Sequence, residues 1–499
     1  MEKAGGISVV NSNLAYKTKA PHITETITTD SPLKWCAVSL SDVVYRGKRL
    51  EASVFDVEAK QARQVIKKGK YPLTTIGGEK GLTNSYTCGR FKRIWVEKSN
   101  LPIYQPSSIV DIKPTPDGYI SHLTKTNIEA LRVSQGQILM TCSGTIGKVS
   151  YVSKTLDKKI FSHDLLRINC KSQFDQGYIY AYLKSKIGNK ILLTNSYGAV
   201  ITHIESEHLA TVPIPDAPDK IKKRIHDLIV HSYELRDESN ELIDEATKLL
   251  IEELHLPKLY EFEVEDYKKN APVETFNVKL SEMNGRADAS YHVPIVDAIV
   301  EHLQKYADEV TTIGDSRISK DVVLAGVFKR TYVGEDYGYP FLGGKEITQL
   351  NPKTEKFLSK PIHKARYEKE LKVVENTILV SDRGTIGTTA LVPKHWNGYA
   401  VSQNVLKVIP VDNSIAGYLY IYLNSEIGNC LVRRQTYGSV VDMIDNNSLS
   451  SVEIPLLKSK DNQSKINSLA LEANEKRYEA YLAEQKALKI MDEEVIYAK

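Results

Sequence analysis

The chain has 499 residues, which is too long for one ordinary hydrophobic core and suits two domains of about 150–200 residues plus connecting elements. Apolar residues make up 41% and charged residues 26%, as is ordinary for a soluble globular protein. The net charge of +4 neither proves nor excludes a local basic patch, and a merely soluble protein of mixed charge fits it equally well.

Cysteine usage and hydropathy argue against several further classes. The five cysteines are far apart and none forms a C-x-x-C motif, so we expect reduced thiols in a cytosol, with no disulfide framework and no zinc site. No run of about 18 apolar residues exists, so we expect no membrane span and a cytoplasmic protein. Residues 1–30 are polar, rich in threonine and without an apolar signal core, and are predicted to be a flexible N-terminal arm.

The rest of the chain is a tandem repeat. Residues 144–147 (GTIG) recur 240 residues later at 384–387, and residues 177–183 (GYIYAYL) recur with the same offset at 417–423 (GYLYIYL). The earlier part of the repeat has an offset of 237, as seen for TTIG at 74–77 and 311–314, GRFKR and GVFKR at 89–93 and 326–330, and RLEAS and RADAS at 49–53 and 286–290. One three-residue insertion reconciles the two offsets, so the chain is predicted to be a duplication.

Each copy of the repeat mixes strand and helix signals. Residues 137–140 and 377–380 are rich in β-branched and aliphatic residues and are predicted to be strands. Residues 178–187 and 418–427 are predicted to be short helices that end before Gly188 and Gly428. Each module is therefore expected to be α+β.

A long helix is predicted after each module. Apolar and small residues alternate at spacings of three and four from Ile221 to Leu249, as in a coiled-coil seam, and Pro218 and Asp219 mark the start. A weaker, alanine-rich seam runs from Ile466 to Ile490, with Lys476 at an apolar position. Because the helices occupy equivalent places in the repeat, we expect them to pair antiparallel. The alternative is two unrelated amphipathic helices, each packed on its own domain.

The GTIG segments are candidates for contact with a ligand. Each follows one predicted strand and precedes another, and its two glycines allow a tight turn with close backbone approach. The spacing is not that of a P-loop, and a structural hairpin turn is an equal alternative. The candidate DNA contacts in and beside the turns are Ser143, Thr145, Lys148, Arg383, Thr385 and Thr388, of which Lys148 and Arg383 could reach a phosphate.

Two further groups recur in both copies. Basic residues interleaved with aromatics suit phosphate and base-edge contacts, and the candidates are Arg90, Lys92, Arg93, Lys329 and Arg330. Gln403 and Asn404 can read adenine, and His163 holds the matching position in the first copy. A solvated charged face, and the capping of a strand end, are the respective alternatives.

An enzymatic function has little support in the sequence. The motifs G-x-S-x-G, H-E-x-x-H and G-x-G-x-x-G are absent. An adenine methyltransferase needs an Asn/Asp-Pro-Pro-aromatic turn, but Asn351-Pro352 is followed by Lys353. A nuclease with a dispersed site and a non-catalytic scaffold with two modules on a coiled-coil stalk remain as alternatives. Salt-dependent DNA binding would separate a DNA-recognition protein from a scaffold.

The order module, helix, module, helix resembles the specificity (S) subunit of Type I restriction-modification systems. The resemblance extends from about Trp35 to the C-terminus. It is carried by the two GTIG turns, the entries at 49–53 and 286–290, and the Ile-Pro exits at 214–215 and 454–455. The N-terminal arm is longer than the resemblance implies, and the second helix seam is weaker.

The resemblance implies an α+β protein with two globular target recognition domains in tandem, separated and joined by two long antiparallel coiled-coil helices. The implied parts are an arm (1–30), domain 1 (31–216), a first spacer helix (217–256), a linker (257–275), domain 2 (276–457) and a second spacer helix (458–499). Each domain would read half of a bipartite double-stranded DNA site. Side chains that read bases are expected in the most divergent segments, about 98–134 and 337–372.

The resemblance also implies partners and places the chemistry in them. The chain itself would hold no cofactor and no metal. Methyltransferase (modification) subunits would bind S-adenosylmethionine and methylate adenine, and a restriction subunit could join them. The helices would dock the methyltransferase subunits, with seam positions at Ile225, Leu228, Leu235, Leu242, Leu249, Ile466, Leu469 and Ile490.

Overall fold

The computed structural model describes residues 38–45, 48–50, 52–198, 201–262, 264, 275–283, 285–352, 356–438 and 440–499. The predicted arm at residues 1–30, and residues 263 and 265–274 of the predicted linker, lie outside the described residues. Among the helices that are described, none is long and apolar enough to cross a membrane.

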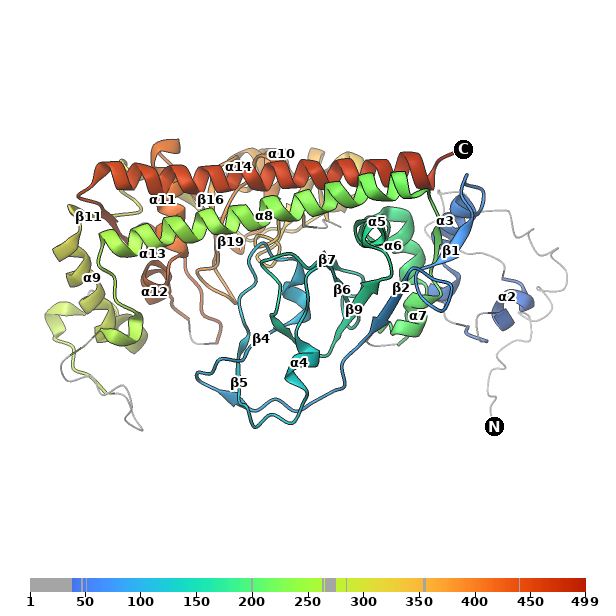
Figure 1. Ribbon diagram of the computed structural model, residues 1–499. Coiled ribbons are helices and arrows are strands. Elements are labelled where there is room, and N and C mark those ends of the chain that lie inside the picture. Colours follow the sequence, from blue (N-terminus) through green and yellow to red (C-terminus); the bar gives the residue numbers. More distant parts are fainter. Residues whose placement is uncertain are drawn as a thin grey trace, which may run out of the picture.

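Two long helices run side by side along the molecule (Figure 1). They are α8 (Asp219–Glu253) and α14 (Lys460–Ile490), and α14 continues into a π-helical segment, Met491–Ile496. The amide of Asn462, at the start of α14, donates to the carboxylate of Glu253, at the end of α8, at 2.7 Å, so the pair is antiparallel. The predicted pairing of the two helices is confirmed.

Polar side chains help to hold the alanine-rich helix α14 against α8. Ser232 Oγ donates to the carbonyl oxygen of Ala480 at 2.7 Å, an approach that small residues permit. Lys476, which interrupts the second seam, is partly exposed and pairs with Glu238 of α8 at 2.6 Å. The interruption therefore lies at the edge of the helix contact, where a charged side chain can remain hydrated.

The first domain contains two four-stranded sheets. The inner sheet has the order β2-β9-β6-β7, formed by Thr83–Tyr86, Leu165–Cys170, Ile138–Thr141 and Val149–Tyr151. The outer sheet has the order β3-β5-β4-β8, formed by Trp95–Val96, Gly118–Ile120, Pro102–Tyr104 and Ile160–Phe161. All neighbours are antiparallel except β4 and β8.

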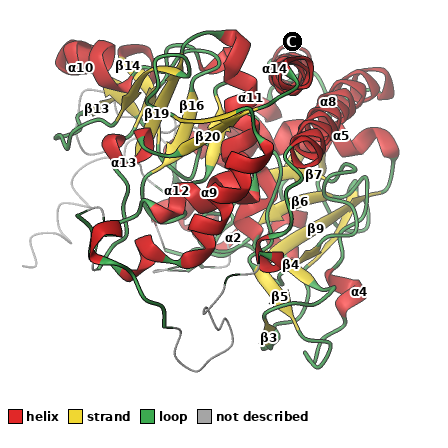
Figure 2. Ribbon diagram, turned by 90° about the vertical axis from the view of Figure 1, so that its left-hand side faces the viewer, coloured by secondary structure: helices red, strands yellow, loops and turns green. Residues whose placement is uncertain are grey.

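The second domain repeats this topology. Its inner sheet, β12-β19-β16-β17, is formed by Ser319–Val323, Val405–Pro410, Ile378–Ser381 and Thr389–Leu391. Its outer sheet, β13-β15-β14-β18, is formed by Tyr332–Val333, Phe357–Ser359, Gly338–Leu342 and Ala400–Val401, again with one parallel pair. Figure 2 shows the two domains on different sides of the helix pair. The α+β class and the duplicated architecture are confirmed.

A two-stranded antiparallel sheet joins the two ends of each domain. In the first domain β1 (Leu73–Thr75) pairs with β10 (Pro213–Pro215), and in the second β11 (Glu309–Thr312) pairs with β20 (Glu453–Leu456). The shorter α-helices are α2 (Leu40–Tyr45), α3 (Val57–Lys67), α4 (Ile128–Leu131), α5 (Gln173–Lys184), α6 (Lys186–Leu193), α7 (Ser206–Ala210), α9 (Pro294–Tyr306), α10 (Lys360–Arg366), α11 (Asn413–Asn424), α12 (Glu426–Arg434) and α13 (Asn446–Ser450).

The predicted single helices at 178–187 and 418–427 are wrong. In both domains a serine leaves the helical conformation, as Ser185 does with φ −61° and ψ 153°, and divides the segment into two helices. The Ser185 hydroxyl accepts a hydrogen bond from the amide of Gly188 at 3.0 Å, and Ser425 makes the matching bond at 3.1 Å. Because serine is a favourable N-cap, it starts a second helix, and each glycine lies inside that second helix.

Each domain is attached to the helix pair through the helix that follows the last strand of its inner sheet, α5 in the first domain and α11 in the second. A Cβ atom on Gly177 of α5 would lie 2.5 Å from the Cα of His226 in α8, and one on Gly417 of α11 would lie 2.3 Å from the carbonyl oxygen of Asn467 in α14. Only glycine allows this approach. Each domain core includes residues of both long helices, so each domain shares its interior with the helix pair.

Candidate nucleic-acid interface

In the first domain, the structure brings together two candidate segments that are far apart in the sequence. The rings of Phe91 and His163 are 5.7 Å apart, edge to face, and the guanidinium of Arg93 lies 5.7 Å from the ring of Trp95. Burial lowers the pKa of His163; Asp164 opposes this, and Arg93 and Arg90 lower it further. His163 is therefore neutral at pH 7 and can both donate and accept a hydrogen bond.

In the second domain, the equivalent positions meet as well. Arg330 Nη2 donates to Gln403 Oε1 at 2.6 Å, and the Arg330 guanidinium lies 5.4 Å from the ring of Phe341. Arg330 and Gln403 correspond in the repeat to Arg93 and His163. With its oxygen engaged by arginine, the Gln403 amide presents its nitrogen as a donor. We call Arg93 with His163, which the ring of Phe91 links, and Arg330 with Gln403 the reading pairs, after the role that we propose for them.

The GTIG turns are rigid on their inner side and open on their outer side. Gly144 and Gly147 have φ of 69° and 80°, and Gly384 and Gly387 repeat this conformation. Inside the first turn, Thr141 Oγ1 donates to the carbonyl oxygen of Thr145 at 2.7 Å and accepts from the amide of Lys148 at 3.0 Å. A Cβ at Gly144 or Gly384 would have no neighbour within 4 Å. The turn is thus held by its own hydrogen bonds, as the structural-turn alternative expects. On the outer side, no neighbouring atom covers Gly144 or Gly384.

The remaining predicted site residues fall into separate places. Lys92, Thr145, Lys329 and Thr385 are exposed, and Asn404 lies half-buried beside Gln403. Arg383 is exposed and pairs with the buried carboxylate of Asp382 at 3.2 Å. Ser143 forms a β-bridge with His203. Lys148 lies elsewhere: with Thr385 and Thr388 it lines a groove of about 1380 Å³ between the two domains and the helix pair.

Sequence reasoning missed several exposed apolar side chains near the reading pairs and the turns. Tyr197 and His203 close a hairpin beside the first GTIG turn with backbone hydrogen bonds of 2.9 and 2.7 Å, and Tyr437 and Met443 close its copy. Trp95, beside Arg93, is 48% exposed. Large apolar side chains are also exposed at Ile201, Tyr437, Val440 and Val441 in the hairpins, at Tyr332 in β13 and at Tyr337 just before β14. The recurrence of Tyr-Gly with the offset of 240 was the available signal for the hairpins.

The predicted helix-docking positions lie within the chain's own core. Ile225, Leu235, Ile466 and Ile490 are buried, and Leu228, Leu242, Leu249 and Leu469 are half-buried against the domain cores. These side chains hold the two domains and the helix pair together. The opposite faces of α8 and α14 are polar and exposed.

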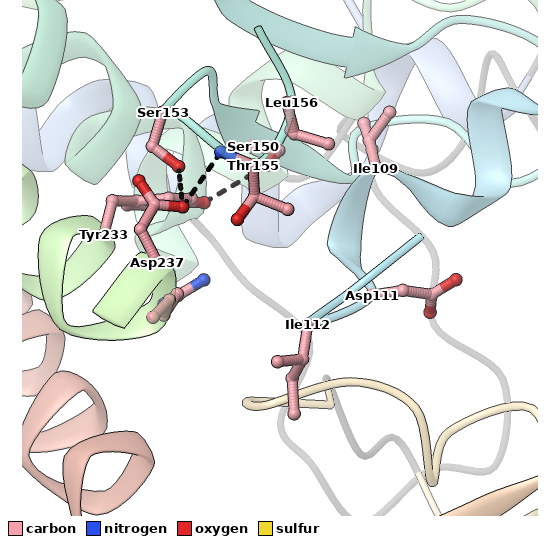
Figure 3. A pocket seen from close by; sticks show the side chains of 10 residues that line it. Ile109, Asp111, Ile112, Ser150, Ser153, Thr155, Leu156, Tyr233 and Asp237 are labelled. Carbon is pink, nitrogen blue, oxygen red and sulfur yellow. Dashed lines mark hydrogen bonds between the residues drawn. The ribbon is translucent and has the colours of Figure 1, made fainter. Parts of the chain in front are cut away.

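Hydrogen bonds, not only apolar contacts, attach the first domain to α8. Asp237 accepts from Ser153 Oγ at 2.9 Å and from the amide of Thr155 at 3.0 Å, around a cavity of about 20 Å³ (Figure 3). The Tyr233 hydroxyl accepts from the amide of Tyr151 at 3.1 Å.

Groups of three or more histidine, cysteine or acidic side chains arranged to hold a metal do not occur among the described residues.

Two comparisons with known proteins bear on this architecture. Residues 32–245 and 327–469 match the family model described as Type I restriction modification DNA specificity domain. Among solved structures, the S subunit of the Type I restriction-modification system from M. genitalium is 14% identical, with a TM-score of 0.33, over 86% of this chain and 96% of that chain. The HsdS subunit from Thermoanaerobacter tengcongensis is 13% identical, with a TM-score of 0.26, over 85% and 99%. No curated protein matches the sequence.

The family model covers more than half of the chain and includes both GTIG turns, most of α8 and the first turns of α14. The resemblance to specificity subunits is thereby confirmed. Such subunits are non-catalytic, so the absence of enzymatic motifs is as expected. The chain belongs to the Type I restriction modification DNA specificity family and is a specificity subunit of a Type I restriction-modification system.

Proposed function

We propose that each domain reads one half of a bipartite DNA site through its reading pair and the exposed surface around it. The observation that carries the proposal is that the same two positions meet in both domains with different chemistry. Arg93 and His163 both lie against the ring of Phe91, whereas Arg330 donates a hydrogen bond directly to Gln403. Arginine selects guanine and glutamine selects adenine in the major groove, so different pairs favour different half-sites. The site is therefore expected to be asymmetric.

The helix pair sets the spacing in this proposal. Helix α8 has 35 residues and α14 has 31. At 1.5 Å per residue they span about 52 and 46 Å, and two half-sites one DNA turn apart lie about 34–36 Å from centre to centre. The helices are therefore long enough to hold two recognition domains along one duplex. Phosphate contacts from Arg90, Lys92, Lys329 and Arg383 would position the duplex without reading it.

The outward polar faces of α8 and α14 are the proposed docking surfaces for methyltransferase subunits. Those subunits would bind S-adenosylmethionine and methylate adenine, and a restriction subunit would join for cleavage, in the cytoplasm. Residues 31–216 and 276–457 are the proposed recognition domains. The part of the first domain at residues 31–37 lies outside the described residues.

Methylation mapping with half-specific variants tests the proposal. The chain is produced with its methyltransferase partner, and methylated adenines are mapped in the host genome. The double variants R93A/H163A and R330A/Q403A are expected to relax opposite halves of one bipartite motif, at a cost of about 1–3 kcal/mol per lost base contact. A motif without a gap, or variants that relax the same half, would refute the proposal.

A further inference from the structure

We call the first domain, together with the parts of α8 and α14 that pack on it, the first half of the molecule. This half contains a buried carboxylate site. The carboxylate of Glu484, in α14, is fully buried and accepts hydrogen bonds from Lys184 Nζ at 2.5 Å, Asn351 Nδ2 at 3.1 Å and Arg236 Nη2 at 3.2 Å. The hydroxyl of Tyr180 also donates to it. A buried carboxylate is stable only when it is paired and hydrogen-bonded in this way. We call Arg236, Tyr180 and Lys184 the donor set of this site.

Matching contacts define the equivalent positions in the second half. The amide of Gly177 donates to Nδ1 of His226 at 3.3 Å in the first half, and the amide of Gly417 donates to Oδ1 of Asn467 at 2.8 Å in the second. The domains are therefore related by an offset of 240, and the long helices by an offset of 241.

These offsets place a second donor set in the other half. Arg477 corresponds to Arg236, Tyr420 to Tyr180 and Asn424 to Lys184. The residue that corresponds to Glu484 is Ile243, which is 3% exposed. All four of these second-half residues line the groove of about 1380 Å³. The second half thus retains donors for an oxyanion and has an aliphatic side chain where the first half supplies the acid.

Arg477 lacks the counter-charge that its counterpart has. It is 5% exposed, its Nε donates to Ser239 Oγ at 2.9 Å, and its guanidinium lies 5.9 Å from the ring of Tyr420. It forms no ion pair with any residue that the structure describes, whereas Arg236 pairs with Glu484. A cation so deeply buried is costly without an anion, and the groove gives an anion access to it.

The groove as a whole suits a small ligand better than a nucleic-acid duplex. Its basic and acidic lining side chains are nearly equal in number, so it offers no strong field for a polyanion. Tyr420 and Ile243 form apolar walls beside the cation, and a few polar groups converge on it, as is usual in small-molecule sites.

We propose that this groove binds a small organic anion whose carboxylate or phosphate group lies against Arg477, Tyr420 and Asn424, in the place that the Glu484 carboxylate occupies in the first half. The ligand's oxygens accept from the guanidinium, the phenol and the amide. The groove is lined by both domains and by α8, so such a ligand lies between the two recognition domains. This function is separate from the reading of DNA.

A substitution that supplies the missing acid from within the chain tests the site without knowledge of the ligand. Ile243→Glu places a carboxylate beside Arg477, and Arg477→Gln removes the cation. If the site is real, I243E melts at or above the wild-type temperature, while I243E in the R477Q background melts well below R477Q alone. An I243E protein that is destabilised equally in both backgrounds would overturn the proposal.

Direct binding of defined anions provides the second test. Titration calorimetry of the full chain with succinate and with inorganic phosphate, at constant ionic strength in chloride, is expected to show one site. R477Q and I243E should each weaken binding at least tenfold, while Lys279→Ala, on the exposed surface outside the groove, should leave it unchanged. No binding of either probe to the wild-type chain would overturn the proposal. Displacement of the bound probe by a duplex that carries the recognition motif would assign the oxyanion to DNA, and would equally overturn it.

Discussion

The two domains agree closely where they meet the helix pair and differ where they face away from it. The inner sheets have the same strand order, and Tyr178 and Tyr418 both donate to a proline carbonyl oxygen at 2.5 Å. The outer regions diverge: the first domain has the single-turn helix α4, whereas the second has α10 followed by a π-helical segment, Tyr367–Leu371. The attachment to the helix pair is thus the same in both copies, whereas the surface that we propose reads DNA differs between them.

A second difference lies inside the helix pair. In the first half, the Glu484 carboxylate occupies the site and accepts from its donor set. In the second half, Ile243 stands at the equivalent position and a groove lies beside it. The duplication therefore preserved the backbone but not the charge balance at its centre. This shows that two copies of one fold can diverge in a buried site while their topology stays the same.

The largest expected effect is at Glu484. Glu484→Gln leaves Arg236 and Lys184 buried without a counter-charge and should reduce the free energy of unfolding by about 3–5 kcal/mol, measured by urea denaturation. Arg477→Gln, at the equivalent cation, should cost only about 1 kcal/mol, because it removes a hydrogen bond to Ser239 but breaks no ion pair among the described residues. Equal losses at the two positions would contradict the contrast between the halves.

The same carboxylate predicts a pH dependence. Burial alone would raise the pKa of Glu484, but Lys184 and Arg236 outweigh it and lower the pKa from 4.5 to about 2. A lowered pKa in the folded state means that the contribution of Glu484 is present above pH 4.5 and is lost as the pH falls toward about 2. Acid unfolding of the wild type should be steeper in this window than that of E484Q, which has no carboxylate to protonate.

The next largest effect is at the glycines that mount the domains. Gly177→Ala and Gly417→Ala each add a Cβ that would lie within 2.5 Å of a long helix, and each should cost about 1–3 kcal/mol or more in thermal or urea unfolding. Gly89→Ala is the matched control, because a Cβ there has no neighbour within 4 Å. A mild effect at only one of the two mounting glycines would show that the domains are attached differently.

A smaller and equal effect is expected at the paired tyrosines. Tyr178→Phe and Tyr418→Phe each remove one buried hydrogen bond to a proline carbonyl and should each cost about 1 kcal/mol. Their unfolding free energies should agree within about 0.5 kcal/mol, with the double variant additive because the sites are far apart. A larger difference between the two losses would show that the two inner cores are not equivalent.

The smallest effect concerns the direct contact between the domains. Asp111 accepts from Thr348 Oγ1 at 2.6 Å, and burial raises its pKa from 3.8 to about 6, although Thr348 and Lys148 oppose the shift. A raised pKa in the folded state means that the stabilisation is present below pH 3.8 and is lost as the pH rises to about 6. The melting temperature should therefore fall less between pH 4 and 6 in Asp111→Asn than in the wild type. An identical pH profile would show that this contact does not sense pH.

Local signals predicted the parts of the fold that depend on neighbouring residues. Glycine pairs in a short segment predict a turn, and a three-four alternation of apolar residues predicts a long helix, so the GTIG turns and the helix at 217–256 were accessible from the sequence. The break at Ser185 was missed because Lys184, Ser185 and Lys186 would also suit the exposed side of one continuous helix, and only the cap geometry reveals two helices.

The sequence predicted which residues belong to the candidate site but not which of them lie together. The repeat offsets pointed to Arg93, His163, Arg330 and Gln403 as recurrent positions, yet the two members of each pair are about 70 residues apart and meet only in the folded sheets. Lys148 follows its turn in sequence, but its side chain lines the central groove and not the reading pair.

By itself, the sequence determined the duplication, the α+β class, the helix pair and the family, because all of these follow from local periodicity and from copied motifs. Tertiary structure alone decided which charges meet. Glu484 lies about 250 to 300 residues from Arg236 and Lys184, and Ile243 is equally far from Arg477. No local pattern encodes contacts across such distances, because they depend on how the two copies close on one pair of helices.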